Sequence, residues 1–256
     1  MNCELCKRGL TRIKSSYFSC SNCGFTRKKH KSEWSSKGTK WEGDHLKIYL
    51  DGEKWRRKVF RSRINLLKYI LNSESEGVDI GSAAGLFVKE CNSKFKSVSA
   101  VEVDSKFSNY SKKINKVPHY SSIYDLTDTY DFVTCFDTLG YSLDIEKFLT
   151  KVIEIIKPGG HLIMSNVSIK KGINSLTDTS FNYYFEDIFW DKTFPSSYKL
   201  KKVKNWSEVK TFNTQEPHSP GWWADYLFMS NNKTIINYSI YQKPKNYNLD
   251  SLGVMK

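Results

Sequence analysis

The chain has 256 residues, 39% of them hydrophobic, which suits one globular domain with a small appendage. No apolar run approaches the roughly 20 residues that a membrane helix needs, so no membrane span is expected. The polar start shows no signal peptide, and we therefore expect a cytoplasmic protein with reduced cysteines.

The formal net charge of +13 is concentrated in the N-terminal part of the chain. Residues 1–72 hold 18 Lys and Arg against 6 Asp and Glu, a net of +12, whereas residues 73–256 hold 22 against 21. Lysines that only solvate a surface would be spread evenly. The asymmetry therefore indicates a polyanionic or phosphorylated partner, either a nucleic acid or a phosphate-bearing metabolite.

Two CxxC pairs in residues 1–30 predict a zinc ribbon, with four cysteine ligands: Cys3, Cys6, Cys20 and Cys23. Each CxxC turn places two thiolates on one side of a tetrahedral Zn²⁺. Thr11–Ile13 and Tyr17–Ser19, between the pairs, predict the hairpin of the ribbon. His30 is an alternative ligand nearby. Four thiolates leave no open coordination position, so the zinc is expected to be structural.

Residues 31–52 show no clear period and are predicted to form a linker or lid. From Glu53 to Leu71 apolar residues recur at three- to five-residue steps, which predicts an amphipathic helix. Its basic side chains include four arginines: Arg56, Arg57, Arg61 and Arg63. This basic face is either solvated or directed toward an acidic substrate.

A glycine turn between a strand and a helix is the most informative feature of the sequence. Val78–Ile80 predicts a short strand, Gly81–Gly85 the turn, and Leu86 the start of a helix. Glycine lets the backbone approach a ligand with no Cβ in the way. The next predicted strand, Val98–Val103, carries Glu102, where an acid can accept both hydroxyls of a ribose. A nucleotide-binding dehydrogenase would share the glycine turn.

Later segments continue the alternation of strands and helices. Tyr130–Asp137 predicts a buried strand that ends in an acid, Glu146–Ile156 an amphipathic helix, and His161–Ser165 a further strand. Asp225–Ser230 and Thr234–Gln242 predict an antiparallel hairpin near the C-terminus.

In order and spacing these segments resemble the class I S-adenosylmethionine (SAM)-dependent methyltransferases. Three stretches carry the resemblance: residues 78–85, 100–105 and 130–165. It implies a Rossmann-like, mostly parallel seven-stranded sheet with a C-terminal antiparallel hairpin, in a domain at residues 53–246 that a tail at 247–256 follows. With the zinc ribbon, the pattern is similar to methyltransferases that modify sugars or other glycan precursors, some of them nucleotide-linked.

The resemblance also implies a SAM site. The residues at cofactor-binding positions of the family are Asp79, Gly81, Ser82, Ala83, Gly85, Glu102, Ser122, Ile123 and Phe136. Glu102 matches the ribose acid, and Ser122 and Ile123 match the adenine contacts. Phe136 lies beside the sulfonium. Ala83 replaces a usual glycine, which a negative φ would tolerate.

Methyl transfer is an in-line displacement, so the protein mainly aligns the reactants and removes a proton from the acceptor. The candidates for the base are Tyr141, His218 and Asp137. Tyr141 stands where many relatives of the family have histidine. His161 begins a core strand and is interpreted as structural.

Two enzyme functions follow from these features. The first is a methyltransferase acting on a small, phosphorylated or nucleotide-linked acceptor such as a sugar, nucleotide-sugar or glycan precursor. The alternative is an RNA or DNA methyltransferase whose ribbon and basic helix bind phosphates. The strand at Tyr130–Asp137 lacks the Asn/Asp-Pro-Pro-aromatic tetrapeptide common in enzymes that methylate base amino groups, which favours the first. A binding protein of the same fold without activity is the remaining possibility.

Overall fold

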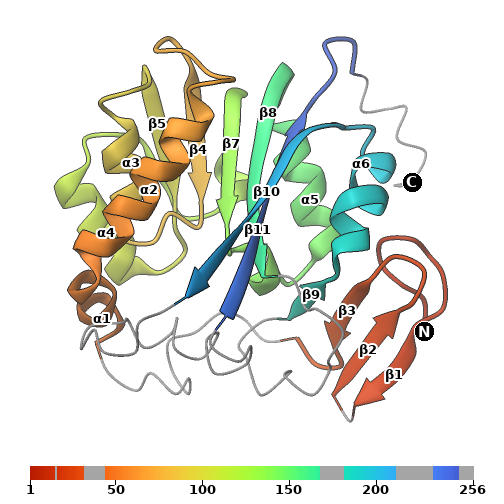
Figure 1. Cartoon of the computed structure of the whole chain (residues 1–256). Helices are drawn as coiled ribbons and strands as arrows, with labels where there is room; N and C mark the ends of the chain where they lie inside the picture. The colour runs from red at the N-terminus through yellow and green to blue at the C-terminus, as the bar shows by residue number, and fades with distance from the viewer. Residues whose placement is uncertain (15, 32–43, 168–181, 212–232, 248–256) are drawn as a thin grey trace.

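The computed structural model describes residues 1–14, 16–31, 44–167, 182–211 and 233–247. Figure 1 shows a large twisted sheet covered by helices and a small sheet that carries the N-terminus. Among the described residues, no helix is long and apolar enough to cross a lipid bilayer.

The small sheet has four antiparallel strands in the order β1-β2-β3-β9. The strands are β1 (Thr11–Lys14), β2 (Tyr17–Cys20), β3 (Phe25–Lys28) and β9 (Tyr183–Phe185). β1 and β2 confirm the hairpin predicted between the cysteine pairs. β3 and β9 are not predicted, and β9 comes from far along the chain to pair with β3.

The large sheet has seven strands in the order β10-β11-β8-β7-β4-β5-β6. The strands are β4 (Glu76–Ile80), β5 (Ser97–Val101), β6 (His119–Tyr120), β7 (Tyr130–Phe136), β8 (Ile156–Val167), β10 (Lys201–Thr211) and β11 (Lys233–Gln242). β4 to β8 are parallel, whereas β11 runs antiparallel to both of its neighbours. The predicted Rossmann-like sheet with an antiparallel C-terminal pair is confirmed.

The C-terminal pair differs from its predicted form. The predicted strand Thr234–Gln242 corresponds to β11, but its outer neighbour is β10. Residues 225–230, the predicted partner, lie outside the described part of the chain. β10 is an edge strand, and lysines are common on such edges. Four of its eleven residues are lysine, which obscures the alternation that identifies strands.

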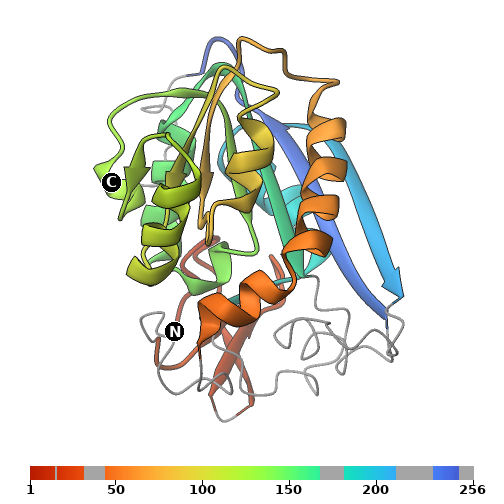
Figure 2. The same ribbon diagram turned by 90° about the vertical axis from the view of Figure 1, so that its left-hand side faces the viewer.

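Helices cover both faces of the large sheet (Figures 1 and 2). They are α1 (His45–Asp51), α2 (Glu53–Leu67), α3 (Leu86–Cys91), α4 (Ser105–Ile114), α5 (Ile145–Glu154) and α6 (Phe194–Ser197), which follows the π-helical turn η4 (Phe189–Thr193). Side chains alternate along β7, so Phe132 packs with α2 and α3 while Val133 packs with α5. Buried apolar side chains therefore form one hydrophobic core on each face of the sheet.

The N-terminal helices differ from the sequence prediction in two ways. α1 lies within residues 31–52, which show no period in sequence. Asp44 caps it by accepting a hydrogen bond from the amide of Lys47 at 3.3 Å, and an Asp before apolar residues is a start signal that the sequence does contain. α2 ends at Leu67 rather than at the predicted Leu71.

Candidate active site

A cavity of about 1020 Å³ opens at the carboxyl ends of β4, β5 and β7. Strand order reverses between β4 and β7, and open α/β sheets bind their ligands at this switch point. α1 and α2 form one wall of the cavity. The turn η2 (Leu139–Tyr141) and the start of α5 form another. This volume lies at the upper end of the range for small-molecule sites, so it has room for two ligands.

The glycine turn after β4 forms the floor of the cavity. Gly81 has φ +74, and a Cβ there would lie 2.0 Å from Thr138 Oγ1. Gly85 has φ +70, and its Cβ would lie 2.0 Å from Ser111 Oγ. Both glycines are therefore required by the backbone and by protein neighbours. Ala83 has φ +47, so the condition under which alanine replaces glycine without strain, a negative φ, is not met, and the backbone is strained at this point.

Glu102 follows β5 and lines the cavity. One carboxylate oxygen accepts the amide of Ala83 at 2.7 Å, and the other accepts the amide of Asp104 at 2.8 Å. Burial raises the pKa of Glu102, while these amides oppose the shift. Each oxygen can accept a second hydrogen bond, so the carboxylate is held in place with capacity for a diol.

Asp79 lies on β4 beneath the glycine turn and is 3% exposed. Thr134 Oγ1 donates a hydrogen bond to its carboxylate at 2.6 Å. Burial raises the pKa of Asp79 to about 7 against the opposing effect of Thr134. The cavity therefore contains a carboxylate whose charge depends on what binds beside it.

Two buried hydroxyls in the cavity wall have no hydrogen-bond partner within the described residues. Ser82 Oγ belongs to the glycine turn, and Ser142 Oγ follows η2. Buried polar atoms are almost always satisfied, so these two hydroxyls are available to a ligand or a water molecule in the cavity. Ser82 lies in the turn after β4, and Ser142 lies two residues before Asp144, the N-cap of α5.

The arginines of α2 form two pairs with different surroundings. Arg57 and Arg61 both bind Glu90 of α3 on the outside. Arg56 and Arg63 are 2% and 3% exposed and line the cavity. The guanidinium of Arg63 lies 4.4 Å from the centroid of the Phe136 ring. That of Arg56 lies 4.0 Å from the Tyr49 ring, and burial lowers its pKa to about 10.

From sequence, the four arginines form one basic face, and Arg56 and Arg63, which line the cavity, are not distinguished from Arg57 and Arg61. Arg56 and Arg63 are seven residues apart, which is two helical turns, and they alternate with Phe60 and Leu67 on one stripe. Their position within the apolar period is the signal that could have distinguished them from Arg57 and Arg61.

The remaining predicted residues lie around the mouth of the cavity. Ser122 caps the turn η1 (Ile123–Asp125), with its hydroxyl accepting the amide of Tyr124 at 3.2 Å. Ile123 is buried beneath it. Asp137, with φ +55, accepts a hydrogen bond from Ser165 Oγ at 3.0 Å. Val103 is 65% exposed on the same cavity wall, although it is an apolar residue.

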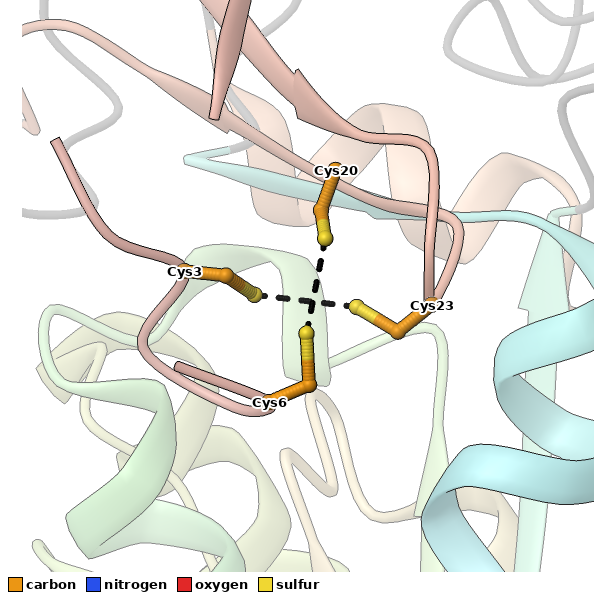
Figure 3. A group of neighbouring side chains, drawn as sticks. All are labelled: Cys3, Cys6, Cys20 and Cys23. Carbon is orange, nitrogen blue, oxygen red and sulfur yellow. Dashed lines mark hydrogen bonds between the residues drawn. The ribbon is translucent and has the colours of Figure 1, made fainter. Parts of the chain in front are cut away.

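The four cysteines of the ribbon converge on one point, as Figure 3 shows. Their sulfur atoms all lie within 4.8 Å of one another, with Cys3 and Cys23 at 3.6 Å and Cys6 and Cys20 at 3.4 Å. A tetrahedral Zn²⁺ with Zn–S bonds of about 2.3 Å separates its sulfurs by about 3.8 Å. No disulfide joins any of the six cysteines. The donor set and its spacing therefore fit Zn²⁺.

Comparison with known proteins identifies the family. Residues 53–207, more than half of the chain, match the family described as "Methyltransferase domain". The chain belongs to this methyltransferase family. Family membership implies SAM as the methyl donor. No curated protein matches the chain.

Several solved structures are similar to the methyltransferase in fold. A chain in the complex of the Haloferax volcanii Trm112 methyltransferase activator with its candidate methyltransferase has a TM-score of 0.60 at 13% identity, over 78% of this chain and 96% of that one. N-methyltransferase NodS from Bradyrhizobium japonicum gives 0.52 at 15%, over 76% and 99%. Coclaurine N-methyltransferase gives 0.56 at 13%, over 84% and 77%. At these identities the likeness concerns the fold alone.

Within the methyltransferase, the cavity brings together most of the residues predicted from sequence. Those in its lining are Asp79, Gly81, Ser82, Ala83, Glu102, Ser122, Ile123, Phe136, Asp137 and Tyr141. Gly85 supports the turn from outside the lining. His161 lies on β8, paired with the middle of β7, and burial lowers its pKa. His218 lies outside the described residues.

Proposed function

We propose that this methyltransferase transfers the methyl group of SAM to a small acceptor that carries phosphate, such as a sugar, a nucleotide-sugar or another glycan precursor. The observation that carries the proposal is the pair of buried arginines in a cavity large enough for two ligands. Arg56 donates to the carbonyl of Tyr49 at 3.1 Å, but a guanidinium has five N–H donors, so each of these side chains can bind an anion in addition to its contacts within the protein. Arginine also binds carboxylate and phosphate in bidentate geometry.

One half of the cavity suits the cofactor. In this proposal Glu102 accepts hydrogen bonds from the ribose hydroxyls. Asp79 faces the ammonium group of the methionine part of SAM, and the hydroxyl of Ser82 contacts the same part. The exposed side chain of Val103 and the buried Ile123 cover the adenine. When bound, SAM supplies a methyl group that is already activated on a sulfonium.

Arg63 and Arg56 divide the anionic groups of the two ligands between them. Arg63 lies against Phe136, and its charge acts on Asp79, which the proposal places at the methionine end of SAM. The carboxylate of SAM belongs to the same end, so Arg63 suits this carboxylate. Arg56 is two turns away, beside Tyr49 of α1, and suits a phosphate of the acceptor. In this proposal Arg63 therefore binds the carboxylate of SAM, and Arg56 binds a phosphate of the acceptor.

Tyr141 and Asp137 are the proposed catalytic residues among those described. Both lie at the end of the cavity between Phe136 and α5. Asp137 is oriented by Ser165, and Tyr141 belongs to the turn η2. Asp137 as a carboxylate, or Tyr141 as a phenolate, can accept the proton of an acceptor hydroxyl, while Ser142 donates a hydrogen bond that orients the acceptor. His218 remains a proposed alternative base.

The four cysteines are proposed to hold one structural Zn²⁺. The supporting observation is the convergence of four sulfur atoms without a disulfide. Elemental analysis of protein purified without added metal should give about one zinc per chain. Zinc-free protein with intact thiols would contradict this assignment.

The contacts of the basic side chains count against a nucleic-acid substrate. Arg57 and Arg61 bind Glu90, and Arg27 and Lys31 bind Glu4 within the ribbon. These four cations are therefore engaged by carboxylates of the protein itself.

A panel of acceptors tests the function. We expect release of S-adenosylhomocysteine (SAH) with nucleotide-sugars or sugar phosphates, and little with the same sugars lacking phosphate. Acceptor affinity should change only several-fold between about 50 and 200 mM salt, because one or two phosphates are involved. Methyl incorporation into RNA, with binding that falls by orders of magnitude over the same range, would overturn the proposal.

A further inference from the structure

The zinc ribbon is built into the methyltransferase domain rather than attached to it. β9 follows β8 of the large sheet along the chain and completes the ribbon sheet (Figure 1). Phe25 pairs with Phe185 and Arg27 with Tyr183, and the side chain of Tyr183 is buried in the shared core. A change in the ribbon therefore acts directly on the residues next to β9.

Asn182, directly before β9, holds the part of the cavity wall that we term the acceptor-side loop, residues 140–143. Its backbone amide donates to the carbonyl of Gly140 at 2.7 Å. Its side-chain amide donates to the carbonyls of Tyr141 at 3.3 Å and Ser142 at 3.1 Å. The residue is fully buried, so these hydrogen bonds are shielded from water.

The first cysteine knuckle reaches the same loop through side chains. Lys31 donates to the carbonyl of Leu143 at 2.8 Å and to Glu4 at 3.1 Å, and Glu4 lies between two of the cysteines. Tyr183 also donates to the carbonyl of Leu143, at 2.8 Å. Lys7, one residue after the knuckle, pairs with Glu146 of α5 at 3.0 Å.

The ribbon also contacts the side chain of the proposed base. Tyr141 packs against the cluster of Tyr17 on β2 and Tyr184 on β9, whose ring centroids are 5.9 Å apart. The cofactor half of the cavity is held differently. Gly81 and Ser82 donate to the carbonyl of Val101, and Ala83 donates to Glu102.

We propose that the metal-loaded ribbon positions the acceptor half of the cavity, with Asn182 as the positioning residue. A Zn²⁺ held by the four cysteines would fix the first knuckle and with it Glu4 and Lys7. These in turn hold Lys31 and α5 against the acceptor-side loop. Without the metal the knuckle opens and the loop loses its support, while the cofactor half keeps its own contacts. The inference rests on the proposed zinc site. Variants of Asn182 and Lys31 in zinc-loaded protein test the coupling without removing zinc.

Hydrogen exchange of the full-length protein measures the coupling. Removal of zinc with a chelator should raise exchange in peptides covering residues 138–145 by about tenfold, and leave residues 78–85 within about twofold. A uniform rise across the chain, or an unchanged loop, would overturn the inference.

Two variants test the coupling in zinc-loaded protein. Asn182→Asp keeps the size of the side chain but replaces its donor, and Lys31→Met removes the bond to Leu143. Both should raise loop exchange while retaining one zinc per chain. Asn109→Asp, exposed on α4, and Lys29→Met, exposed beside the ribbon, are the matched controls. If both test variants exchange like their controls, the inference is wrong, whether or not zinc is present.

A fluorine signal from Tyr141 separates positioning from a general loss of stability. In protein labelled with 3-fluorotyrosine, Tyr141→Phe identifies its resonance. We expect Asn182→Asp to shift or broaden that resonance and to leave the resonances of Tyr49 and Tyr130 in place. SAH affinity should stay within about threefold of wild type, because the cofactor half is held by other residues. An unmoved Tyr141 resonance would contradict a positioning role.

Discussion

At the scale of single residues, four residues of the cavity lining have an unusual conformation or a hydroxyl that is unpaired within the described residues. Ala83 and Asp137 are non-glycine residues with positive φ, and Ser82 and Ser142 have hydroxyls without partners in the described structure. Strain and unsatisfied groups are costly in a folded protein and persist mainly where function requires them. The sequence shows the residue types but not their φ values, so it could not show that Ala83 has a positive φ.

Glu102 gives the first prediction. Glu102→Gln should weaken SAH binding by about tenfold or more, since a charge-assisted contact contributes roughly 1.5–3 kcal/mol. Calorimetry measures the effect. Glu74→Gln, exposed before β4, is the control and should bind as wild type does. Equal affinity of Glu102→Gln and wild type would remove Glu102 from the cofactor site.

Substitution of Asp79 by asparagine should stabilise the ligand-free protein but weaken the binding of SAH. The pKa of Asp79 is raised to about 7 by burial, so the native state holds the proton more tightly than the unfolded chain. The stability that this provides is complete below the unfolded pKa near 3.9 and is lost as pH rises through 7. Ligand-free Asp79→Asn should therefore be more stable than wild type at pH 8.

The binding of SAH should change in the other direction. If its ammonium meets ionised Asp79, affinity in wild type weakens as pH falls, approaching tenfold per unit below pH 7. Asp79→Asn should bind weakly and lack this slope. Thermal melts and calorimetry from pH 5 to 8 measure both effects, and identical profiles for the two proteins would contradict the role of Asp79.

At the scale of helices and strands, the sequence predicts the segments whose pattern is local. The glycine turn, β4, β5, β7 and α5 follow from hydrophobic period and turn residues within short windows. β9 could not be predicted in this way. It has three residues, and its pairing with β3 bridges more than half of the chain. Short strands whose partner is distant carry little local signal.

α2 gives a prediction with an internal control. Arg56→Met and Arg61→Met remove the same charge from one helix, but only Arg56 lines the cavity. Arg56→Met should weaken binding of a phosphate-bearing acceptor by about tenfold to a hundredfold and leave SAH binding largely intact. Arg61→Met should change neither. Equal losses in both variants would indicate a general charge effect rather than a site.

At the scale of the whole molecule, the charge asymmetry of the sequence has a structural explanation. The basic N-terminal part forms the ribbon and the two helices that close one wall of the cavity. Several of its cations bind acidic residues of the protein, as Lys7 does with Glu146. The sequence therefore indicates where positive charge is needed, but only the fold distinguishes cations that face a ligand from those that join two parts of the chain.

The measurement that tests the account most directly is calorimetric titration of the wild-type protein with SAH. The cavity, with Glu102 fixed by two amides and Asp79 beneath the glycine turn, predicts one SAH per chain with a Kd in the low micromolar range, about −8 kcal/mol. Absence of binding at millimolar SAH, in protein that is folded and carries zinc, would contradict the assignment of this cavity as a methyltransferase site.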